Sequence, residues 1–360
     1  MGRCHAALEG VGLSFWRHRR VLLTGHTGFK GAWLCLWLER LGAQVIGAAL
    51  PPPTDPSLFA LLSPWPALDH GIADITKADA IIPAIAASKA DVLVHMAAQS
   101  LVPVGHRDPI GTFAANVMGT VHVLQAGLAL PSLKAALIVT TDKVYADPDS
   151  GRAFTEDDGL GGNEPYGSSK AAAELAVDAY RAAYAAKGIG LATARAGNVI
   201  GGGDWSPDRL VPDLARALWT GTPVSLRHPD GIRPWQHVLD PLAGYLAYLE
   251  RLIEDPGAAP PTLNFAPPDE SCRRVAEVVE HFVARFNDHP GWKPAAGAGF
   301  REATVLRLSA AKARATLAWR PRLDFAAAVA WTTDWYAAHR NGADMRAITA
   351  AQIERYEALG

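Results

Sequence analysis

Short aliphatic runs alternate with alanine-rich stretches of helical length through the first half of the chain. Such alternation is typical of parallel strands joined by crossover helices. The runs do not place a polar residue at every second position, as expected for strands that helices cover on both faces. We expect strands at 21–24, 44–48, 71–74, 91–96, 136–141 and 191–195. The pattern therefore predicts an α/β fold with a doubly wound parallel sheet.

The pattern changes after about residue 199. Glycine, proline and tryptophan become denser there, in runs such as GGGDWSPDR and RHPDGIRPW, and the regular alternation weakens. This change predicts a second, smaller lobe of mixed α/β structure. We expect a Rossmann-like lobe over 15–198, a segment at about 232–265 that returns to it, a smaller lobe mainly over 199–350, and an N-terminal extension over 1–14.

Composition narrows the class of protein. The chain of 360 residues is 49% hydrophobic and 19% charged, with a net charge of -2, so we expect a soluble globular protein without attraction to nucleic acid or anionic membranes. Cys4, Cys35 and Cys272 are too far apart for a metal or redox motif, and we interpret them as reduced thiols of a cytoplasmic protein. We expect no metal site, and no apolar run is long enough for a signal peptide or a membrane helix.

The first predicted strand is followed by GHTGFKG and then by an apolar helix. Glycines at such a strand-to-helix turn let backbone amides meet a pyrophosphate, and the alternative is a tight turn without a ligand. His26 and Lys30 either add charge at the phosphates or are solvated. The motif residues expected to bind a dinucleotide are Gly25, His26, Gly28, Phe29, Lys30 and Gly31.

The acid that usually follows about 20 residues later and binds a ribose hydroxyl is missing, since Asp55 lies beyond the second predicted strand. NAD and NADP are therefore not distinguished by this rule. Asp74, with Ile75 beside it, closes the third predicted strand and is a candidate adenine contact. A cap at the start of a helix is the alternative for Asp74.

The motif YGSSK places Tyr166 and Lys170 on one face of a predicted helix. A lysine ammonium near a phenol favours the phenolate and lowers a pKa that starts near ~10. The tyrosine can then remove a hydroxyl proton while hydride leaves the same carbon. The alternative is a surface pair without a catalytic role.

The motif TTDKVY places Thr141 at the end of the fifth predicted strand, with Asp142 and Lys143 next to it. Ligands of α/β sheets bind beyond the carboxyl ends of the strands, so we expect these side chains to face the cofactor crevice. A helix cap or a surface ion pair is the alternative. A plain alcohol dehydrogenase needs only a hydroxyl here, so two ionisable neighbours predict further proton transfers.

The chain resembles the extended short-chain dehydrogenase/reductase family, and within it the CDP-D-glucose 4,6-dehydratases, from about Phe15 to Trp335. The most specific feature is Asp-Lys after Thr-Thr, because related dTDP-glucose and GDP-mannose dehydratases carry Glu at the second place and UDP-hexose epimerases carry small uncharged residues. The span 146–165 departs from the family, being acidic and rich in glycine where members carry Trp or Tyr. The matching motifs are TGHTGFKG, HMAAQS, NVMGT, TTDKVY, YGSSK, RAGNVIGGGDW, DRLVPD and RPWQHVLD.

The resemblance implies a lyase that dehydrates CDP-D-glucose to CDP-4-dehydro-6-deoxy-D-glucose, with bound NAD as a temporary store of hydride. Tyr166 takes the C4 hydroxyl proton with help from Thr141, while Lys170 holds the cofactor ribose and lowers the pKa of the tyrosine. Lys143 assists removal of the C5 proton, and a protonated Asp142 helps to expel the C6 hydroxyl as water. Hydride then returns to C6.

The resemblance also implies the remaining site residues. Ala97, Ala98 and Gln99 line the cofactor or hexose pocket, and Asn116 braces the catalytic strand or helix, with packing as the alternative. The residues implied at the sugar and the diphosphate are Asn198, Arg209, Arg233 and Glu302. For either arginine a structural salt bridge is the alternative.

The family further implies a homodimer formed through two long helices and a setting in bacterial deoxysugar synthesis, including the sugars of lipopolysaccharide O-antigen. The cytosine base is implied by resemblance alone. Two other functions stay open: a nucleotide-sugar 4-epimerase or dehydratase of another nucleotide, and a catalytically silent NAD(P)-binding sensor. Sensors of that kind tend to lose the tyrosine and lysine pair, which is present here.

Overall fold

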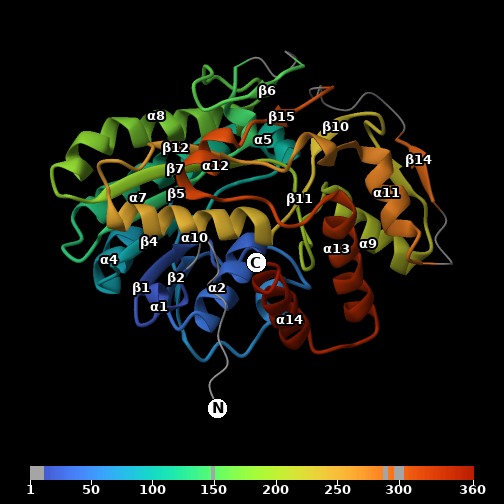
Figure 1. The fold of residues 1–360 in the computed structure, drawn as a ribbon, viewed down its shortest axis with the longest axis horizontal. Helices are drawn as coiled ribbons and strands as arrows, with labels where there is room; N and C mark the ends of the chain where they lie inside the picture. Colours follow the sequence, from blue (N-terminus) through green and yellow to red (C-terminus); the bar gives the residue numbers. More distant parts are fainter. Residues whose placement is uncertain (1–11, 147–150, 287–290, 296–303) are drawn as a thin grey trace.

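Seven parallel strands form the central sheet of the computed structural model, which describes residues 12–146, 151–286, 291–295 and 304–360 (Figure 1). The strand order is β12-β7-β5-β4-β1-β2-β3, and all neighbours are parallel. The strands are β1 (Arg20–Thr24), β2 (Gln44–Ala49), β3 (Leu68–Ile72), β4 (Val92–His95), β5 (Ala135–Val139), β7 (Gly190–Ala196) and β12 (Thr262–Phe265).

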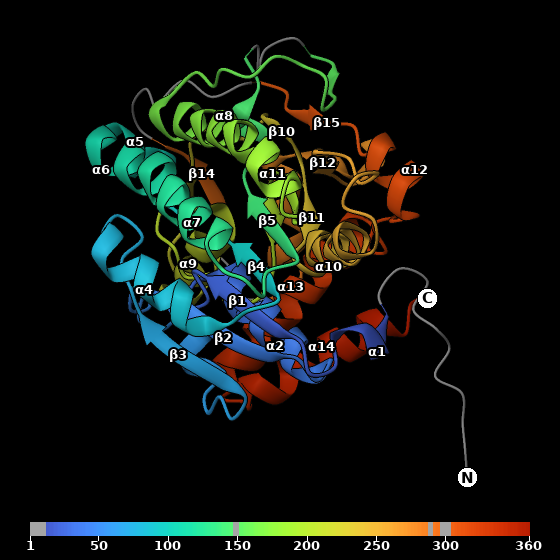
Figure 2. The same cartoon turned by 90° about the vertical axis from the view of Figure 1, so that its left-hand side faces the viewer.

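Helices cover both faces of this sheet, as Figure 2 shows. Strand side chains alternate between the faces, so Leu22 packs into one hydrophobic cluster while Val21 and Leu23 pack into the other. The predicted doubly wound fold is therefore confirmed. One face carries α4 (Ala78–Ser88), α7 (Gly119–Leu128) and α8 (Pro165–Ala185), and the other carries α2 (Phe29–Arg40) and α10 (Leu239–Glu254).

Two strand predictions differ from the structure. The third strand was expected at 71–74 but is β3, which ends at Ile72. This edge strand carries Asp69 and His70 and is largely exposed, so it lacks the apolar run that marked the other strands. The fifth strand was expected to end at Thr141, but β5 ends at Val139 because Thr141 begins the following turn. Strand β12 lies within the range 232–265, and the lobe boundaries stay predictions.

Outside the central sheet the chain forms short strand pairs and further helices, of which α9, α11, β10 and β14 lie on the right of Figure 1. The paired strands are β8 (Val199–Ile200) with β11 (Gln236–His237), β9 (Val224–Leu226) with β14 (Trp292–Pro294), β10 (Ile232–Pro234) with β13 (Cys272–Arg274), and β6 (Ala153–Phe154) with β15 (Arg307–Leu308). The helices are α9 (Leu210–Thr220), α11 (Val275–Val283), α12 (Ala311–Leu317), α13 (Phe325–Arg340) and α14 (Met345–Glu357).

The remaining elements are short. They are α1 (Leu13–Trp16), α3 (Leu58–Leu61), α5 (Val102–Arg107), α6 (Pro109–Phe113), the π-helical turn η1 (Ala114–Met118), and the 3-10 turns η2 (Asp142–Val144) and η3 (Asp269–Ser271). Among the described residues, none of the helices combines the length and the apolar character needed to cross a membrane.

The strand order reverses between β1 and β4, which is the point where open α/β sheets bind ligands. The carboxyl ends of β1, β4, β5 and β7 meet at this edge of the sheet. The segments that follow them carry Gly25, Ala97, Thr141 and Asn198. The fold therefore brings four of the sequence motifs together.

Candidate active site

The glycine turn after β1 has the geometry of a pyrophosphate cradle. Gly25 has a φ of 77°, and a Cβ there would lie 2.6 Å from the backbone N of Ala97. A Cβ on Gly31 would lie 2.2 Å from the carbonyl oxygen of Gly25. Helix α2 begins at Phe29, and its N-cap Gly28 provides no side chain to bind the first N–H groups. These groups are free to bind the phosphates of a dinucleotide, so the turn fits NAD.

His26 lies in this turn but does not face solvent. Its ring is buried, its Nε2 lies 2.6 Å from Nδ1 of His70, and it packs edge-on against Phe59. Burial, helped by the neighbouring His70, lowers the pKa of His26 to about 4. Both interpretations of this side chain are wrong, because it is neither charged nor solvated at neutral pH.

Asp74 and Ile75 lie in the turn after β3. The Asp74 carboxylate accepts hydrogen bonds from the backbone N–H and the hydroxyl of Thr76, at 2.9 and 2.8 Å. The carbonyl oxygen of Ile75 lies 2.8 Å from Nδ1 of His122 on α7. Asp74 therefore shapes a turn of its own rather than capping α4, whose N-cap is Lys77. An adenine contact stays a proposal for both residues.

The segment after β4 is tied to α8 by Asn116. Its amide oxygen accepts from the backbone N–H of Gln99 at 2.9 Å, and its amide nitrogen donates to the Gln99 carbonyl and the Ser169 hydroxyl, each at 2.9 Å. Asn116 lies in η1, where one extra residue widens the helical turn. The Gln99 side chain is held by Thr112 and Leu101. These bonds fix the loop next to Ala97 and Ala98.

A cavity of about 460 Å³, the central cavity, lies beyond the carboxyl ends of β5 and β7. It is lined by the predicted proton-handling residues and by three of the four residues predicted for the sugar and the diphosphate. Lys170 is buried and does not line the cavity, and the residues predicted only for the dinucleotide, apart from Lys30, do not line it either. The predicted residues that line it are Lys30, Thr141, Asp142, Lys143, Tyr166, Asn198, Arg209 and Arg233.

Asp142 is buried at the floor of the central cavity. Its Oδ1 accepts a hydrogen bond from the Thr141 hydroxyl at 3.0 Å, whereas its Oδ2 has no hydrogen-bond partner among the described residues. A Cβ on Gly197 would lie 1.9 Å from Oδ2, so the carboxylate needs a glycine at that place. A buried oxygen without a partner is uncommon and is available to a ligand.

The tyrosine and lysine pair differs from its prediction in one respect. Burial raises the pKa of Tyr166 to about 12, although a hydrogen bond with Thr141 and the charge of Arg209 act in the other direction. Lys170 donates to the carbonyl of Val139 at 2.9 Å, and burial lowers the pKa of Lys170 to about 8. The predicted lowering of the tyrosine pKa by lysine is therefore wrong for this structure.

A second cluster of charged residues lies behind the carboxyl end of β5. Both oxygens of Glu174 are bonded: Oε1 accepts from Thr140 at 2.5 Å and from Arg195 at 2.8 Å, and Oε2 accepts from Thr193 at 2.7 Å and from Arg195 at 3.1 Å. Burial favours the neutral guanidinium, but the carboxylate outweighs it and raises the pKa of Arg195. Sequence reasoning missed this pair, although Glu174 follows Lys170 by one helical turn.

The arginines predicted for the diphosphate already contact protein groups. Arg209 donates to Asp204 at 3.0 Å and to the Ser100 hydroxyl at 2.9 Å, so it links the start of α9 to the segment after β4. Arg233 is buried and donates to its neighbour's carbonyl, that of Ile232, at 2.9 Å. Neither Asp204 nor Ser100 was predicted. Glu302 lies outside the described residues.

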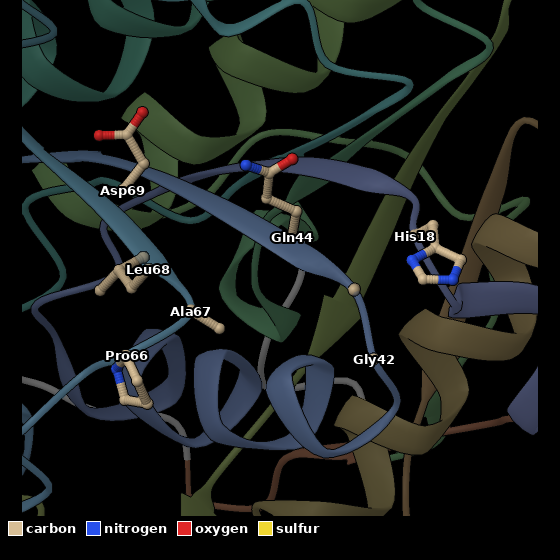
Figure 3. A pocket seen from close by; sticks show the side chains of 8 residues that line it. His18, Gly42, Gln44, Pro66, Ala67, Leu68 and Asp69 are labelled. Carbon is tan, nitrogen blue, oxygen red and sulfur yellow. The ribbon is translucent and has the colours of Figure 1, made fainter.

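A second hollow of about 540 Å³ opens at the amino ends of β1, β2 and β3 (Figure 3). His18, Gln44 and Asp69 project around it. None of the predicted site residues lines it, and ligands of open α/β sheets bind at the opposite ends of the strands. We assign no function to it.

A family model described as "NAD dependent epimerase/dehydratase family" matches residues 21–259. The chain belongs to this family. The match includes the glycine turn, the Asp-Lys pair, the Tyr166 helix and Arg233. The family assignment confirms the predicted resemblance and the predicted cofactor, NAD.

Known proteins are similar to this chain in sequence or in structure. The chain is 40% identical over 349 residues to a CDP-glucose 4,6-dehydratase of Salmonella typhimurium, covering 95% of this chain and 97% of that protein. An epimerase of Methanothermobacter thermautotrophicus has a TM-score of 0.81 at 20% identity, over 91% of this chain and 95% of its own. A dTDP-glucose 4,6-dehydratase of Bacillus anthracis, solved with NAD, has a TM-score of 0.72 at 21% identity, over 91% and 99%. The two structures support the fold alone.

Proposed function

We infer that this chain is an NAD-dependent lyase that converts CDP-D-glucose into CDP-4-dehydro-6-deoxy-D-glucose. The observation that carries this function is the adjacent pair Asp142 and Lys143 in the wall of the cavity that Tyr166 also lines. Oxidation at one carbon needs a single proton acceptor, whereas elimination of water needs a base and an acid as well. The 40% identity to a CDP-glucose 4,6-dehydratase supports the same reaction and the same nucleotide.

The oxidation belongs to Tyr166, Thr141 and Lys170. When bound, NAD supplies the acceptor for hydride from C4 of the sugar and the donor that later returns it to C6. Tyr166 takes the proton of the C4 hydroxyl, and the hydrogen bond from Thr141 and the charge of Arg209 favour its phenolate. Lys170 holds the ribose with the donors that its bond to Val139 leaves unused.

The elimination belongs to Asp142 and Lys143. A ketone at C4 makes the C5 hydrogen acidic, and Lys143 removes it. Asp142, in its protonated form, gives its proton to the C6 hydroxyl, which leaves as water. The Oδ2 atom, which has no hydrogen-bond partner among the described residues, is the oxygen that reaches the sugar.

The diphosphate is held by Arg209 and Arg233, with Asn198 at the sugar. All three line the central cavity, on segments that follow β7 or begin α9 and β10. A guanidinium suits a phosphate because its planar fork donates two bonds at once. Arg209 then exchanges part of its bonding to Asp204 and Ser100 for phosphate oxygens.

A homodimer is the assembly that the surface supports. Large apolar side chains are exposed on α6, η1 and α8, with Ile110 83% and Leu175 60% exposed, together with Phe113 and Met118. These elements contact one another, and exposed apolar side chains of this kind often mark an interface between protein chains. We expect Ile110→Lys to convert a dimer into a monomer in light scattering. An unchanged molar mass would contradict this interface.

The deciding experiment is product identification. Purified protein and NAD are incubated with CDP-, dTDP-, UDP- and GDP-hexoses, and the products are analysed by mass and NMR. We expect CDP-glucose to lose one water and to give a 4-keto-6-deoxy sugar. Tyr166→Phe is the control that keeps nucleotide binding and loses turnover. An epimer of unchanged mass would make the protein a 4-epimerase, and binding without any product would make it a sensor.

A further inference from the structure

The two steps of the dehydration change the protonation of Tyr166 and Asp142 in opposite directions. Tyr166 gains the proton of the C4 hydroxyl in the oxidation, and Asp142 loses a proton to the C6 hydroxyl in the elimination. Lys143 takes the C5 proton and returns it to C5 when hydride reaches C6, so it ends the cycle unchanged. A second turnover therefore requires that one proton passes from Tyr166 to Asp142.

The hydroxyl of Thr141 lies between these two side chains. It donates to Oδ1 of Asp142 at 3.0 Å and also forms a hydrogen bond with Tyr166. The three residues line the central cavity together. The backbone N–H of Lys143 donates to the same Oγ1 at 3.4 Å, which holds Thr141 as the N-cap of η2. One fixed hydroxyl thus connects the proton acceptor of the oxidation with the proton donor of the elimination.

The bonding capacity of this hydroxyl sets the direction of the connection. A hydroxyl donates one proton and accepts with two lone pairs. The proton of Thr141 points to Asp142 and one lone pair accepts from Lys143, so the second lone pair is left to accept from Tyr166 while the latter is a phenol. The chain of hydrogen bonds then runs from the phenol to the carboxylate, which is the direction that the proton count requires.

Exchange with solvent is the other route by which the two groups could recover their protonation. Tyr166 is only 8% exposed and Asp142 only 3%. Burial also raises the pKa of Tyr166 to about 12, so its phenol rarely gives a proton to water. A path inside the protein is therefore faster than one through the solvent.

We propose that Thr141 is a proton relay that restores both Tyr166 and Asp142 within each catalytic cycle. The proposal rests on the dehydration proposed above. When Asp142 gives its Oδ2 proton to the C6 hydroxyl, its Oδ1 receives the proton of Thr141, and Thr141 receives the phenol proton of Tyr166. Each O–H bond that breaks is matched by one that forms, so Tyr166 becomes a phenolate again and Asp142 keeps one proton.

The relay closes the balance of the whole cycle. The C4 hydrogen moves as hydride to C6, the C5 proton goes to Lys143 and back, and the C6 oxygen leaves with the bonding electrons. The second proton of the expelled water corresponds in number to the proton that the C4 hydroxyl lost. A half-turn of the Asp142 carboxyl about its Cβ–Cγ bond then returns its proton to the oxygen on the side of the sugar.

The experiment measures kcat for dehydration of CDP-glucose by full-length protein with NAD, at increasing concentrations of imidazole. The variants are Thr141→Val, which replaces the hydroxyl by a methyl group, and Thr141→Ser, which keeps it. We expect Thr141→Val to lower kcat about a hundredfold, as the loss of a proton-transfer group does. Imidazole should restore part of this kcat, because it exchanges protons with buried groups once the product has left. Thr141→Ser should keep the wild-type kcat and ignore imidazole.

Deuterium at C4 of the sugar separates a relay from simple help in the oxidation. When recovery of the protonation limits turnover in Thr141→Val, cleavage of the C4–H bond does not, so deuteration should leave its kcat unchanged. A low kcat that falls further with deuterium and does not respond to imidazole would assign Thr141 to the oxidation alone and overturn the proposal. A wild-type kcat in Thr141→Val would overturn it as well.

Thr140→Val is the matched control. Thr140 is the preceding buried threonine, and its hydroxyl donates to Glu174 at 2.5 Å rather than to a group that lines the central cavity. Its kcat should not respond to imidazole. Should Thr141→Val not fold, Thr141→Ala provides the same comparison. A wild type that gives no dehydrated product would count against the proposed function, whereas normal dehydration by wild type without these changes in Thr141→Val would count only against the relay.

Discussion

Two groups of charged side chains flank the carboxyl end of β5, and they differ in how completely their polar atoms are paired. Behind the strand end, Glu174 and Arg195 form a closed cluster with Thr140 and Thr193, in which both carboxylate oxygens are bonded. In front of it, Asp142 keeps an oxygen without a partner among the described residues.

The open cluster consists of Asp142, Lys143, Tyr166 and Lys30, all of which line the central cavity. The difference teaches how to distinguish a structural charge from a reactive one in this fold. Buried charges that only hold the strand end satisfy each other, because an unpaired buried charge is costly. Charges that handle protons must leave atoms free for the substrate.

Asp142→Asn breaks the open cluster and should have the largest effect. We expect kcat to fall about a thousandfold, because the amide has no acidic proton to give to the leaving hydroxyl. The free energy of unfolding should change little, since the amide oxygen still accepts from Thr141. Turnover assays and urea unfolding measure the two effects. Asp240→Asn is the control, being the same change at a buried carboxylate away from the cavity.

Glu174→Gln breaks the closed cluster, and its effect should fall on stability. Arg195 is left buried without a counter-charge, so we expect the free energy of unfolding to drop by about 3 kcal/mol. Turnover per folded molecule should change far less than in Asp142→Asn. The double variant Glu174→Gln with Arg195→Met should recover part of the loss in urea unfolding. A drop below about 1 kcal/mol would show that the pair does not hold the strand end.

Gly197→Ala sharpens the comparison because it moves the open cluster without changing its chemistry. The new methyl would lie 1.9 Å from Oδ2 of Asp142, so the carboxylate must shift. We expect kcat to fall about a hundredfold, since a misplacement near 1 Å has that effect on a catalytic group. Gly159→Ala is the control, because a Cβ at Gly159 meets nothing within 4 Å. Full activity in Gly197→Ala would mean that Asp142 tolerates displacement.

Asp240 tests whether a buried carboxylate oxygen without a hydrogen-bond partner is by itself a sign of a catalytic role. Its Oδ1 accepts from Tyr356 and from the backbone of Arg322, each at 2.8 Å, while Oδ2 has no partner among the described residues. Burial raises the pKa of Asp240 to about 7. Between its ordinary value and pH 7 the folded state keeps a proton that the unfolded state releases, so stability falls as the pH rises.

Between pH 5 and pH 8 we expect the free energy of unfolding of wild type to fall by about 2 kcal/mol more than that of Asp240→Asn. Urea unfolding at both pH values measures the difference. Burial also raises the pKa of Glu250 to about 7. Its contribution to the pH dependence is the same in both proteins, so the comparison with wild type removes it. Turnover at pH 7 should be unaffected, because Asp240 does not line the cavity. An identical pH dependence in the two proteins would mean that Asp240 is charged in the folded state.

Much of the fold was predictable because buried parallel strands leave continuous apolar runs. The runs that became β1, β2, β4, β5 and β7 were all recognised. The exposed edge strand β3 was misplaced, since its sequence LDHGI has no such run. The turn of Thr141 out of the sheet was missed because a threonine suits a strand and a helix cap equally well.

The residue types of the site were predictable from motifs, but their ionisation was not. Spacing placed Tyr166 and Lys170 on one helix, yet it carries no information on burial, which dominates the pKa of both. The burial of His26 depends on Gly47, whose missing side chain makes room for the ring. Contacts of this kind join residues that are distant in the sequence, so a single chain does not reveal them.

The π-helical turn η1 also constrains how this chain can vary in length. Deleting one residue before Asn116 would restore a regular α-helix and rotate the asparagine by roughly 100° about its axis. Its amide would then point away from Gln99 and Ser169, and the loop after β4 would lose its anchor on α8. We therefore expect homologues that shorten this helix to supply the anchor from another residue.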